Sequence, residues 1–152
     1  MATPNALLDS NIIIAIVDEA HQHHEHSLAL LIDAKAKKFA VSAHSFAETY
    51  STLTRRSPSS PFRWSPDDAW FAIESVGIAT TLVGLTPGQT FDTIKSYASG
   101  AGVGARLYDR LIGQVAVQYD IRCIVTWNTG HMRDLFPELT VLDPLAYVTQ
   151  TQ

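Results

Sequence analysis

The sequence predicts an α/β protein whose parallel sheet is flanked by helices. Short apolar segments alternate along the chain with longer segments of helical periodicity, the pattern typical of this class. The first apolar segment, Ala6–Leu8, runs directly into Asp9. Buried parallel strands read as near-continuous apolar runs, and open α/β sheets bind ligands beyond the carboxyl ends of their strands. Asp9 is therefore expected at the edge of the sheet where such folds place their chemistry.

Five short segments are predicted as strands. They are Ala6–Leu8, Phe39–Val41, Thr80–Val83, Arg122–Val125 and Thr140–Leu142. The 152 residues suffice for one domain with a substantial core, and no repeat, linker or second domain is apparent. We therefore expect residues 1–152 to form a single domain.

Helices are predicted between these strands. The run Ile12–Val17 is ambiguous because β-branched residues favour strands, and we interpret it as a short buried helix because a strand that ends at Asp9 must leave the sheet. The second predicted helix is an amphipathic segment that opens at His23–Glu25 and continues through Leu28, Leu31, Ile32 and Ala36, with Lys35, Lys37 and Lys38 near its end. The remaining predicted helices run from Ser42 through Arg55–Arg56, from Ser65 through Val76, from Thr86 through Tyr97, from Leu107 through Gln118 and from His131 through Leu135.

The charge of the chain limits how it can contact nucleic acid. The net charge is −4, so the whole molecule is not an electrostatic trap for nucleic acid and any such contact requires a local basic patch. One candidate patch combines Arg55, Arg56 and Arg63 with Trp64. Cations mixed with an aromatic ring suit single-stranded RNA, and they suit a docked partner peptide equally well.

The single cysteine and the absence of hydrophobic targeting signals favour a cytoplasmic protein. Cys123 lies in an apolar run, which predicts a buried structural thiol, and no disulfide is possible within one chain. The N-terminus lacks the pattern of a secretory signal, and no apolar run approaches the length of a membrane span. We therefore expect a cytoplasmic location without membrane contact.

Four polar residues stand at the edges of apolar elements that are far apart in sequence. They are Asp9, Glu48, Asp109 and Asn128, separated by 39, 61 and 19 residues. Mg²⁺ and Mn²⁺ prefer oxygen ligands and keep several bound waters. Carboxylates converging from several elements would hold such an ion and leave positions open for a substrate phosphate and water. The pattern predicts a metal site.

The order and spacing of these motifs resemble a known family. Leu7–Asn11, Phe46–Glu48, Tyr108–Asp109 and Val125–Asn128 look like the motifs of a PIN domain, and more narrowly those of VapC-type ribonuclease toxins. The stretch His23–Glu25 also looks like that family. The resemblance spans nearly the whole chain. It implies a three-layer α/β/α fold with a parallel sheet of four or five strands, a Mg²⁺- or Mn²⁺-dependent endoribonuclease, a homodimer, and a VapB-like antitoxin that silences the toxin.

Carried over position by position, the resemblance implies that Asp9, Glu48 and Asp109 bind the metal and that Asn128 completes the catalytic set. Asn128 stands where many members of the family have aspartate, and asparagine is also common in this subgroup. An amide contributes an oxygen but no negative charge, so a second metal would be bound less strongly. We therefore favour one tightly held ion, with a second recruited by the substrate.

Five further residues are assigned supporting roles. Ser10 and Thr126 match small hydroxyl residues that orient the site in the family, and this assignment rests on the resemblance. Arg106 and Arg110 flank Asp109 and are candidate contacts to RNA phosphates, as is His131. For the two arginines, ordinary pairing with neighbouring acids is an equally good explanation.

Other interpretations of the same residues remain open. Asp9 could only cap a helix, Glu48 could be an ordinary helix residue, and Asp109 could only stabilise a first turn. The segment His21–His26 suggests zinc, but it lacks a recognisable ligand spacing. Two other functions are a PIN-like binding protein with a degraded metal site, and a haloacid-dehalogenase-like phosphatase. The phosphatase requires an acid where Asn11 stands.

Overall fold

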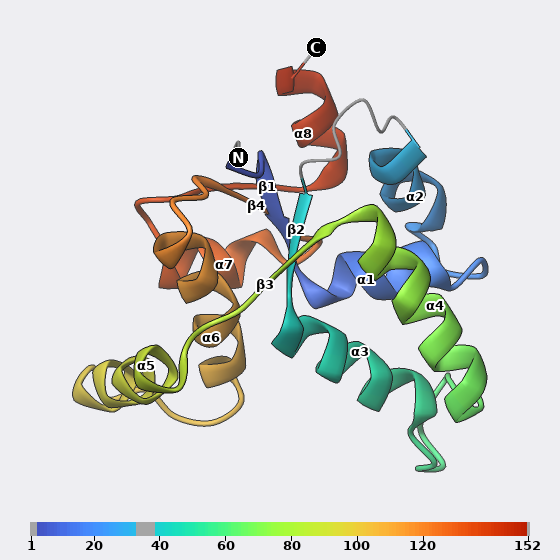
Figure 1. Ribbon diagram of the computed structural model, residues 1–152, viewed down its shortest axis with the longest axis horizontal. Helices are drawn as coiled ribbons and strands as arrows, with labels where there is room; N and C mark the ends of the chain where they lie inside the picture. The colour runs from blue at the N-terminus through green and yellow to red at the C-terminus, as the bar shows by residue number, and fades with distance from the viewer. Residues whose placement is uncertain (1–2, 33–38, 152) are drawn as a thin grey trace.

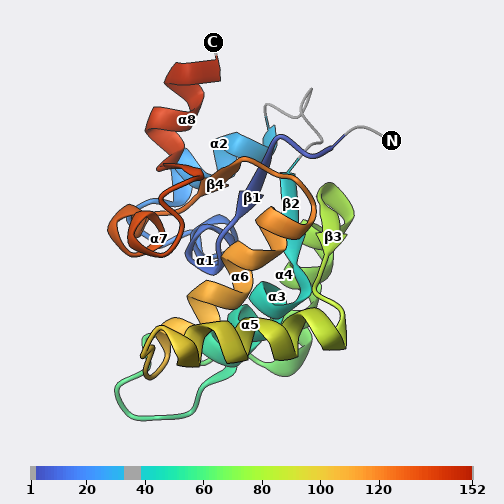
Figure 2. The same cartoon turned by 90° about the vertical axis from the view of Figure 1, so that its left-hand side faces the viewer.

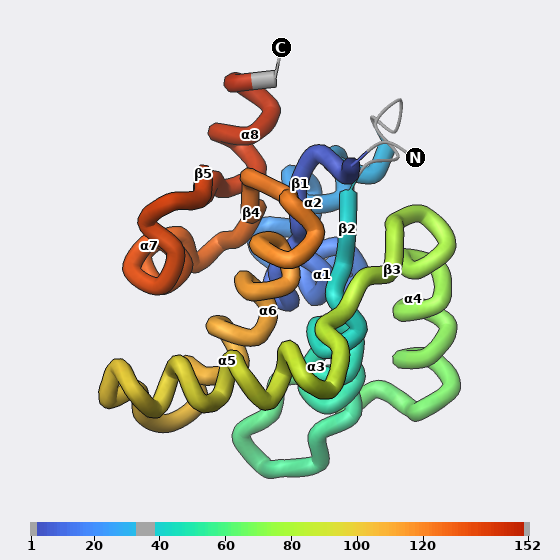
Figure 3. Tube along the Cα trace, turned by 60° about the vertical axis from the view of Figure 1, so that its left-hand side comes forward, coloured from blue at the N-terminus to red at the C-terminus, as the bar shows by residue number. Residues whose placement is uncertain are grey.

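Five parallel strands form the centre of the computed structural model, which describes residues 3–32 and 39–151. The strands are β1 (Ala6–Leu8), β2 (Phe39–Ser42), β3 (Thr81–Val83), β4 (Cys123–Val125) and β5 (Thr140–Leu142). Their order is β3-β2-β1-β4-β5, and every neighbouring pair is parallel (Figure 3). The order reverses direction between β1 and β4, and such a switch point is where open α/β sheets place ligands. The predicted α/β class and parallel sheet are confirmed.

Helices connect the strands and cover the sheet (Figure 1). They are α1 (Ser10–Val17), α2 (His24–Ile32), α3 (Ala43–Thr54), α4 (Pro66–Ala79), α5 (Pro87–Ser99), α6 (Arg106–Gln118), α7 (Thr129–Leu135) and α8 (Pro144–Thr151). The predicted extension of the second helix through Ala36, with Lys35, Lys37 and Lys38, lies outside the described residues. Helix α8 was not among the helices predicted from the sequence.

The two faces of the sheet carry separate hydrophobic cores, which makes the three layers of the fold. Successive strand residues point to opposite faces, so Leu8 and Val41 enter one core while Leu7 and Ala40 enter the other. The first core joins the sheet to α1, α2, α4 and α8, and the second joins it to α6 and α7. Figure 2 shows the two sides, with α6 in front of the strands and α1 behind them.

The ambiguous run after Asp9 is helical, as predicted. Ile12, Ile13 and Ile16 are buried, and their spacing places all three on the sheet side of α1. Burial of this face outweighs the weak preference of isoleucine for strands. The helix starts at Ser10, because Asp9 has extended backbone angles and accepts a hydrogen bond from the first backbone amide of α1.

The single cysteine was predicted to be a structural thiol in an apolar run, and no segment was predicted to span a membrane. Cys123 is partly buried in β4, and burial raises the pKa of its thiol to about 11, so the thiol is neutral and unreactive at neutral pH. Among residues 3–32 and 39–151, none of the helices combines the length and hydrophobicity needed to cross a bilayer.

The contact between α6 and α7 generates a prediction about stability. Gly113 is buried in α6, and a methyl group there would overlap the ring of Phe136, which is itself fully buried. Gly113→Ala should lower the free energy of unfolding by about 1–3 kcal/mol, because the overlap outweighs the helix preference of alanine. Urea denaturation measures this change.

Gly77, in the last turn of α4, is the matched control. A methyl group there would make only an ordinary contact with Phe46, so Gly77→Ala should leave stability unchanged or raise it by up to about 1 kcal/mol. If Gly113→Ala is as stable as Gly77→Ala, the close packing of α6 on Phe136 is wrong.

Candidate metal and active site

Asp9 is held rigidly at the carboxyl end of β1. Its side chain is only 5% exposed, and both carboxylate oxygens accept hydrogen bonds. Oδ1 accepts from the backbone amide of Ser10 at 2.7 Å, and Oδ2 accepts from the hydroxyl of Thr126 at 2.9 Å. Asp9 therefore caps α1 and also contacts the neighbouring strand end, so the capping role and a role in the site coexist.

Thr126 is the centre of a small polar network between β1 and β4. Its hydroxyl donates to Asp9 and accepts from the Asn11 side-chain amide and from the Asn128 backbone amide, each at 3.0 Å. The Asn11 carbonyl accepts from the Trp127 backbone amide at 3.0 Å. The network forms because the parallel register of β1 and β4 brings the segments after Leu8 and Val125 side by side. The sequence analysis did not assign Asn11 this role, although it lies two residues after Asp9.

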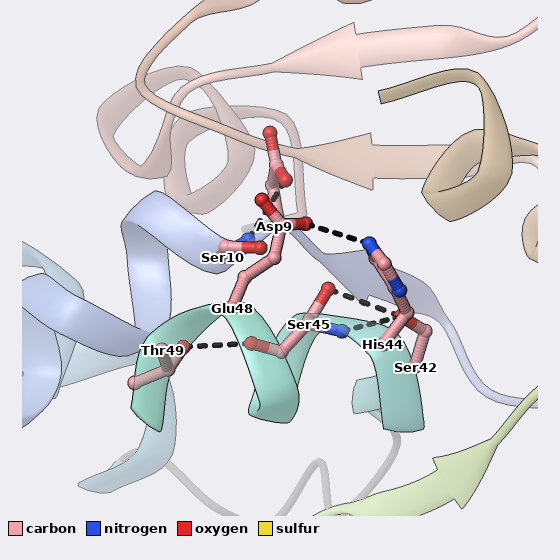
Figure 4. Close-up of polar contacts among 7 residues, drawn as sticks. All are labelled: Asp9, Ser10, Ser42, His44, Ser45, Glu48 and Thr49. Atoms are coloured by element: carbon pink, nitrogen blue, oxygen red, sulfur yellow. Dashed lines mark hydrogen bonds and ion pairs between the residues drawn. The ribbon is translucent and has the colours of Figure 1, made fainter. Parts of the chain in front are cut away.

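Glu48 approaches the same edge from α3. This helix begins where β2 ends, and its start is fixed by Ser42, whose hydroxyl accepts from the Ser45 backbone amide at 3.0 Å. Glu48 lies on the face of α3 turned toward Asp9 (Figure 4). Its Oε1 atom is buried without a hydrogen-bond partner among the described residues and lies 3.3 Å from Nε2 of His44.

His44 is a contact that the sequence analysis missed. It precedes Glu48 by four residues on α3, and this spacing on a predicted helix was the signal that could have revealed it. Burial lowers the pKa of His44, which favours the neutral ring near neutral pH. The ring also stacks on Tyr108 of α6, with ring centroids 5.3 Å apart.

Asp109 comes from the first turn of α6 and faces His131 and Arg106. Burial raises the pKa of Asp109, and the positive charges of His131 and Arg106 partly oppose that rise. The Asn128 side-chain amide lies 2.8 Å from Nδ1 of His131. Asn128 thus lies at the same edge of the sheet, and its side chain contacts His131.

The three carboxylates repel one another. Burial raises the pKa of Asp9 to about 6; hydrogen bonds from Thr126 and Ser10 oppose this rise, and the charges of Asp109 and Glu48 add to it. The pKa of Glu48 is raised by burial first and by the charge of Asp109 second. A cation bound between them would relieve this repulsion.

The residues of this edge fit a divalent cation with hard oxygen ligands. Asp9, Glu48 and Asp109 supply carboxylates, and the buried Oγ of Ser10 and Oε1 of Glu48 have no hydrogen-bond partner among the described residues. No group of three His, Cys, Asp or Glu side chains in residues 3–32 and 39–151 is close enough to form a ready cage. Mg²⁺ does not require one, because it is commonly held by one or two carboxylates and several waters.

Other candidate residues have structural contacts. The Arg110 guanidinium lies over the ring of Phe136, 5.0 Å from its centroid. In the histidine-rich stretch, His23 stacks on Trp127 at 3.8 Å and His24 lies 2.8 Å from the Ala15 carbonyl. These contacts account for both histidines by packing, and the described residues contain no zinc-like cluster. The proposed roles of Arg106, Arg110 and His131 toward RNA stay predictions.

A family comparison identifies the class of protein. The model of the PIN domain family matches residues 6–134, which is most of the chain. The chain therefore belongs to the PIN domain family, and this prediction is confirmed. No functionally curated protein matches the sequence.

Solved structures with the same fold include several toxin–antitoxin proteins. The chain is similar to a DNA-bound VapBC complex from Salmonella typhimurium (TM-score 0.66, 16% identity, covering 93% of this chain and 99% of that one). It is also similar to VapBC2 from Rickettsia felis bound to a DNA fragment from its promoter (TM-score 0.62, 16% identity, covering 90% of this chain and 96% of that one). A third similar structure is that of VapC20 from Mycobacterium tuberculosis, described as a Sarcin-Ricin loop cleaving toxin (TM-score 0.61, 14% identity, covering 78% of this chain and 86% of that one). At these identities the likeness establishes the fold.

Removal of the Asp9 charge should change how stability depends on pH. The pKa of this carboxyl is 3.8 when unperturbed and about 6 in the folded protein, so the folded state binds more protons between these values. Stability from this group is therefore present at low pH and is lost as pH rises through about 6. The unfolding free energy of Asp9→Asn minus that of wild type should therefore increase by up to about 3 kcal/mol as the pH rises from about 4 to 7.

Urea denaturation in a metal chelator at several pH values measures the difference. Asp134→Asn, at an exposed position of α7, is the matched control. A constant difference between wild type and Asp9→Asn across this pH range would contradict the buried, electrostatically opposed state of Asp9.

Proposed function

We propose that the protein is a Mg²⁺- or Mn²⁺-dependent endoribonuclease that acts as the toxin of a toxin–antitoxin pair. One observation carries the proposal: three partly or fully buried carboxylates from β1, α3 and α6 lie at the switch point of the sheet, where burial raises the pKa of each and the charges of Asp109 and Glu48 add to the rise at Asp9. Such an arrangement costs stability, and a bound cation explains why it is present.

Each residue has a distinct part in the proposed reaction. Asp9, Glu48 and Asp109 would hold the ion, which when bound neutralises phosphate charge and activates water for hydrolysis of the phosphodiester. Thr126 and the Ser10 backbone amide fix the Asp9 carboxylate, so it needs no rearrangement. Arg106 lies beside Asp109 and provides positive charge toward an approaching RNA phosphate, and His131, also beside Asp109, is a second candidate contact.

The family and the structural neighbours support the biological role. The chain belongs to the PIN domain family, and one neighbour is described as a toxin that cleaves the Sarcin-Ricin loop. Other neighbours are toxin–antitoxin complexes, some of them bound to DNA. On this basis we propose a VapB-like antitoxin as partner, a homodimeric toxin and a cytoplasmic location.

Cleavage of RNA is the direct test of the reaction. Purified protein with Mg²⁺ or Mn²⁺ should cleave RNA and leave 5′-phosphate and 3′-hydroxyl ends, and Asp9→Asn should reduce the rate by at least about 100-fold because it removes a charged metal ligand. Electrophoresis and end-group analysis measure both results. Undiminished cleavage by a correctly folded Asp9→Asn protein would refute the assignment.

Binding of Mn²⁺ separates the nuclease from the second candidate, a PIN-like binding protein with a degraded site. Two observations favour that candidate: Asn128 replaces a fourth carboxylate, and the described residues form no ready cage. Calorimetry should show Mn²⁺ binding that weakens at low pH, and Asn128→Asp should raise the affinity by roughly ten-fold through the added charge. No binding at millimolar Mn²⁺ would favour the binding protein.

The phosphatase interpretation loses support from the structure. That chemistry requires an acid two residues after Asp9, where this chain has Asn11. The Asn11 side chain is engaged on both its nitrogen and its oxygen with Thr126 and Trp127. Asn11 therefore organises the loop after β4, and its amide cannot supply the general acid that the phosphatase reaction requires.

A further inference from the structure

A groove runs away from the acidic site along one face of α3. It has a volume of about 440 Å³, within the range of small-ligand sites. His44, Glu48, Ser51 and Arg55 recur along the groove at helical spacing, and Tyr108 of α6 contributes to its lining. Glu48 belongs to both the groove and the carboxylate cluster, so a ligand in the groove would be continuous with one at the metal site.

Tyr108 has the properties of a stacking platform. Its residue is 47% exposed, and its ring lies at 23° to the ring of His44, which supports it from α3. The Tyr108 side chain has no hydrogen bond to any part of the chain that the structure describes. Exposed aromatic rings with one supported face are the elements on which single-stranded nucleic acids stack their bases.

Arg55 supplies a free cation at the far end of the groove. The next arginine, Arg56, donates to the Trp64 carbonyl at 2.9 Å, and Arg63 donates to the Ser57 carbonyl at 3.2 Å. Arg55 is exposed and makes neither an ion pair nor a hydrogen bond with residues 3–32 or 39–151. It lies seven residues after Glu48, about 10 Å along the helix axis.

We propose that this groove binds a nucleotide of single-stranded RNA next to the cleaved phosphodiester, with its base stacked on Tyr108 and a phosphate further along the strand held by Arg55. The proposal rests on the ribonuclease function and adds the subsite that positions the strand. The arrangement suits a polyanion, because a cation must offset the repulsion between RNA and the three carboxylates. The Ser51 and Thr52 side chains between the two ends offer hydroxyl groups to the sugar or phosphate.

Binding measurements on the full chain test the groove independently of cleavage. The parent carries Asp9→Asn, the ligand is a fluorescent single-stranded RNA, and anisotropy is recorded in a chelator at several salt concentrations. Tyr108→Ala should weaken binding by about ten-fold, whereas Tyr108→Phe, which keeps the ring, should bind within about two-fold of the parent. Arg55→Gln should reduce the slope of log affinity against log salt by about 0.7, the value for one phosphate contact.

The chain offers matched controls for both substitutions. Tyr50 is an exposed tyrosine of α3 that does not line the groove, and Arg122 is an exposed arginine just before β4, at the opposite edge of the sheet. Tyr50→Ala and Arg122→Gln should leave RNA affinity and its salt slope unchanged. Urea denaturation of every variant verifies that a loss of binding is not a loss of folding.

RNAs that carry a single abasic nucleotide locate the stacked base. At one position the missing base should weaken binding to the parent but not to Tyr108→Ala, since the contact is already absent in that variant. If wild-type protein cleaves RNA but Tyr108→Ala and Arg55→Gln bind like their controls, the groove assignment is overturned. If these variants lose binding although wild type does not cleave, the groove assignment stands and the proposed nuclease function fails.

Discussion

The hydroxyl of Thr126 connects the two halves of the site, and the rest of the arrangement depends on it. It donates a hydrogen bond to Asp9 at the end of β1. It also accepts hydrogen bonds from the Asn11 side-chain amide and the Asn128 backbone amide, across the switch point of the sheet. Three elements of the fold therefore converge on one atom. The parallel pairing of β1 with β4 brings these groups together, so the architecture of the sheet and the orientation of the first carboxylate have the same origin.

The burial of the three carboxylates lowers the stability of the folded protein at neutral pH. Asp9 is almost fully buried, and its hydrogen bonds do not compensate for the lost hydration, since its pKa remains well above the ordinary value. Glu48 and Asp109 are also shifted upward, with burial as the first cause in both. A protein selected for stability alone would replace such a cluster, and the cation of the proposed function would offset this unfavourable electrostatic energy.

The sequence predicted the parts of the structure that depend on local pattern. The apolar run before Asp9, the helix starts at Ser42 and Ser65 and the alternation of elements are local signals, and the structure agrees with them. The role of Asn11 was not predictable, because its partners lie 115 and 116 residues away and are set by the pairing of two strands. The helix α8 was missed because its apolar residues follow no strong helical pattern.

The single helix α3 carries both Glu48 of the carboxylate cluster and most residues that line the groove. Its first turn is fixed by Ser42 at the end of β2, and every later residue on the same face inherits that position at a fixed spacing. Glu48 therefore reaches the carboxylate cluster while Arg55, two turns further, reaches the end of the groove. Under the proposed function, a strand of RNA laid along this face would have its scissile phosphate aligned by the same helix cap that positions Glu48. Any shift of α3 would move Glu48 and the groove together.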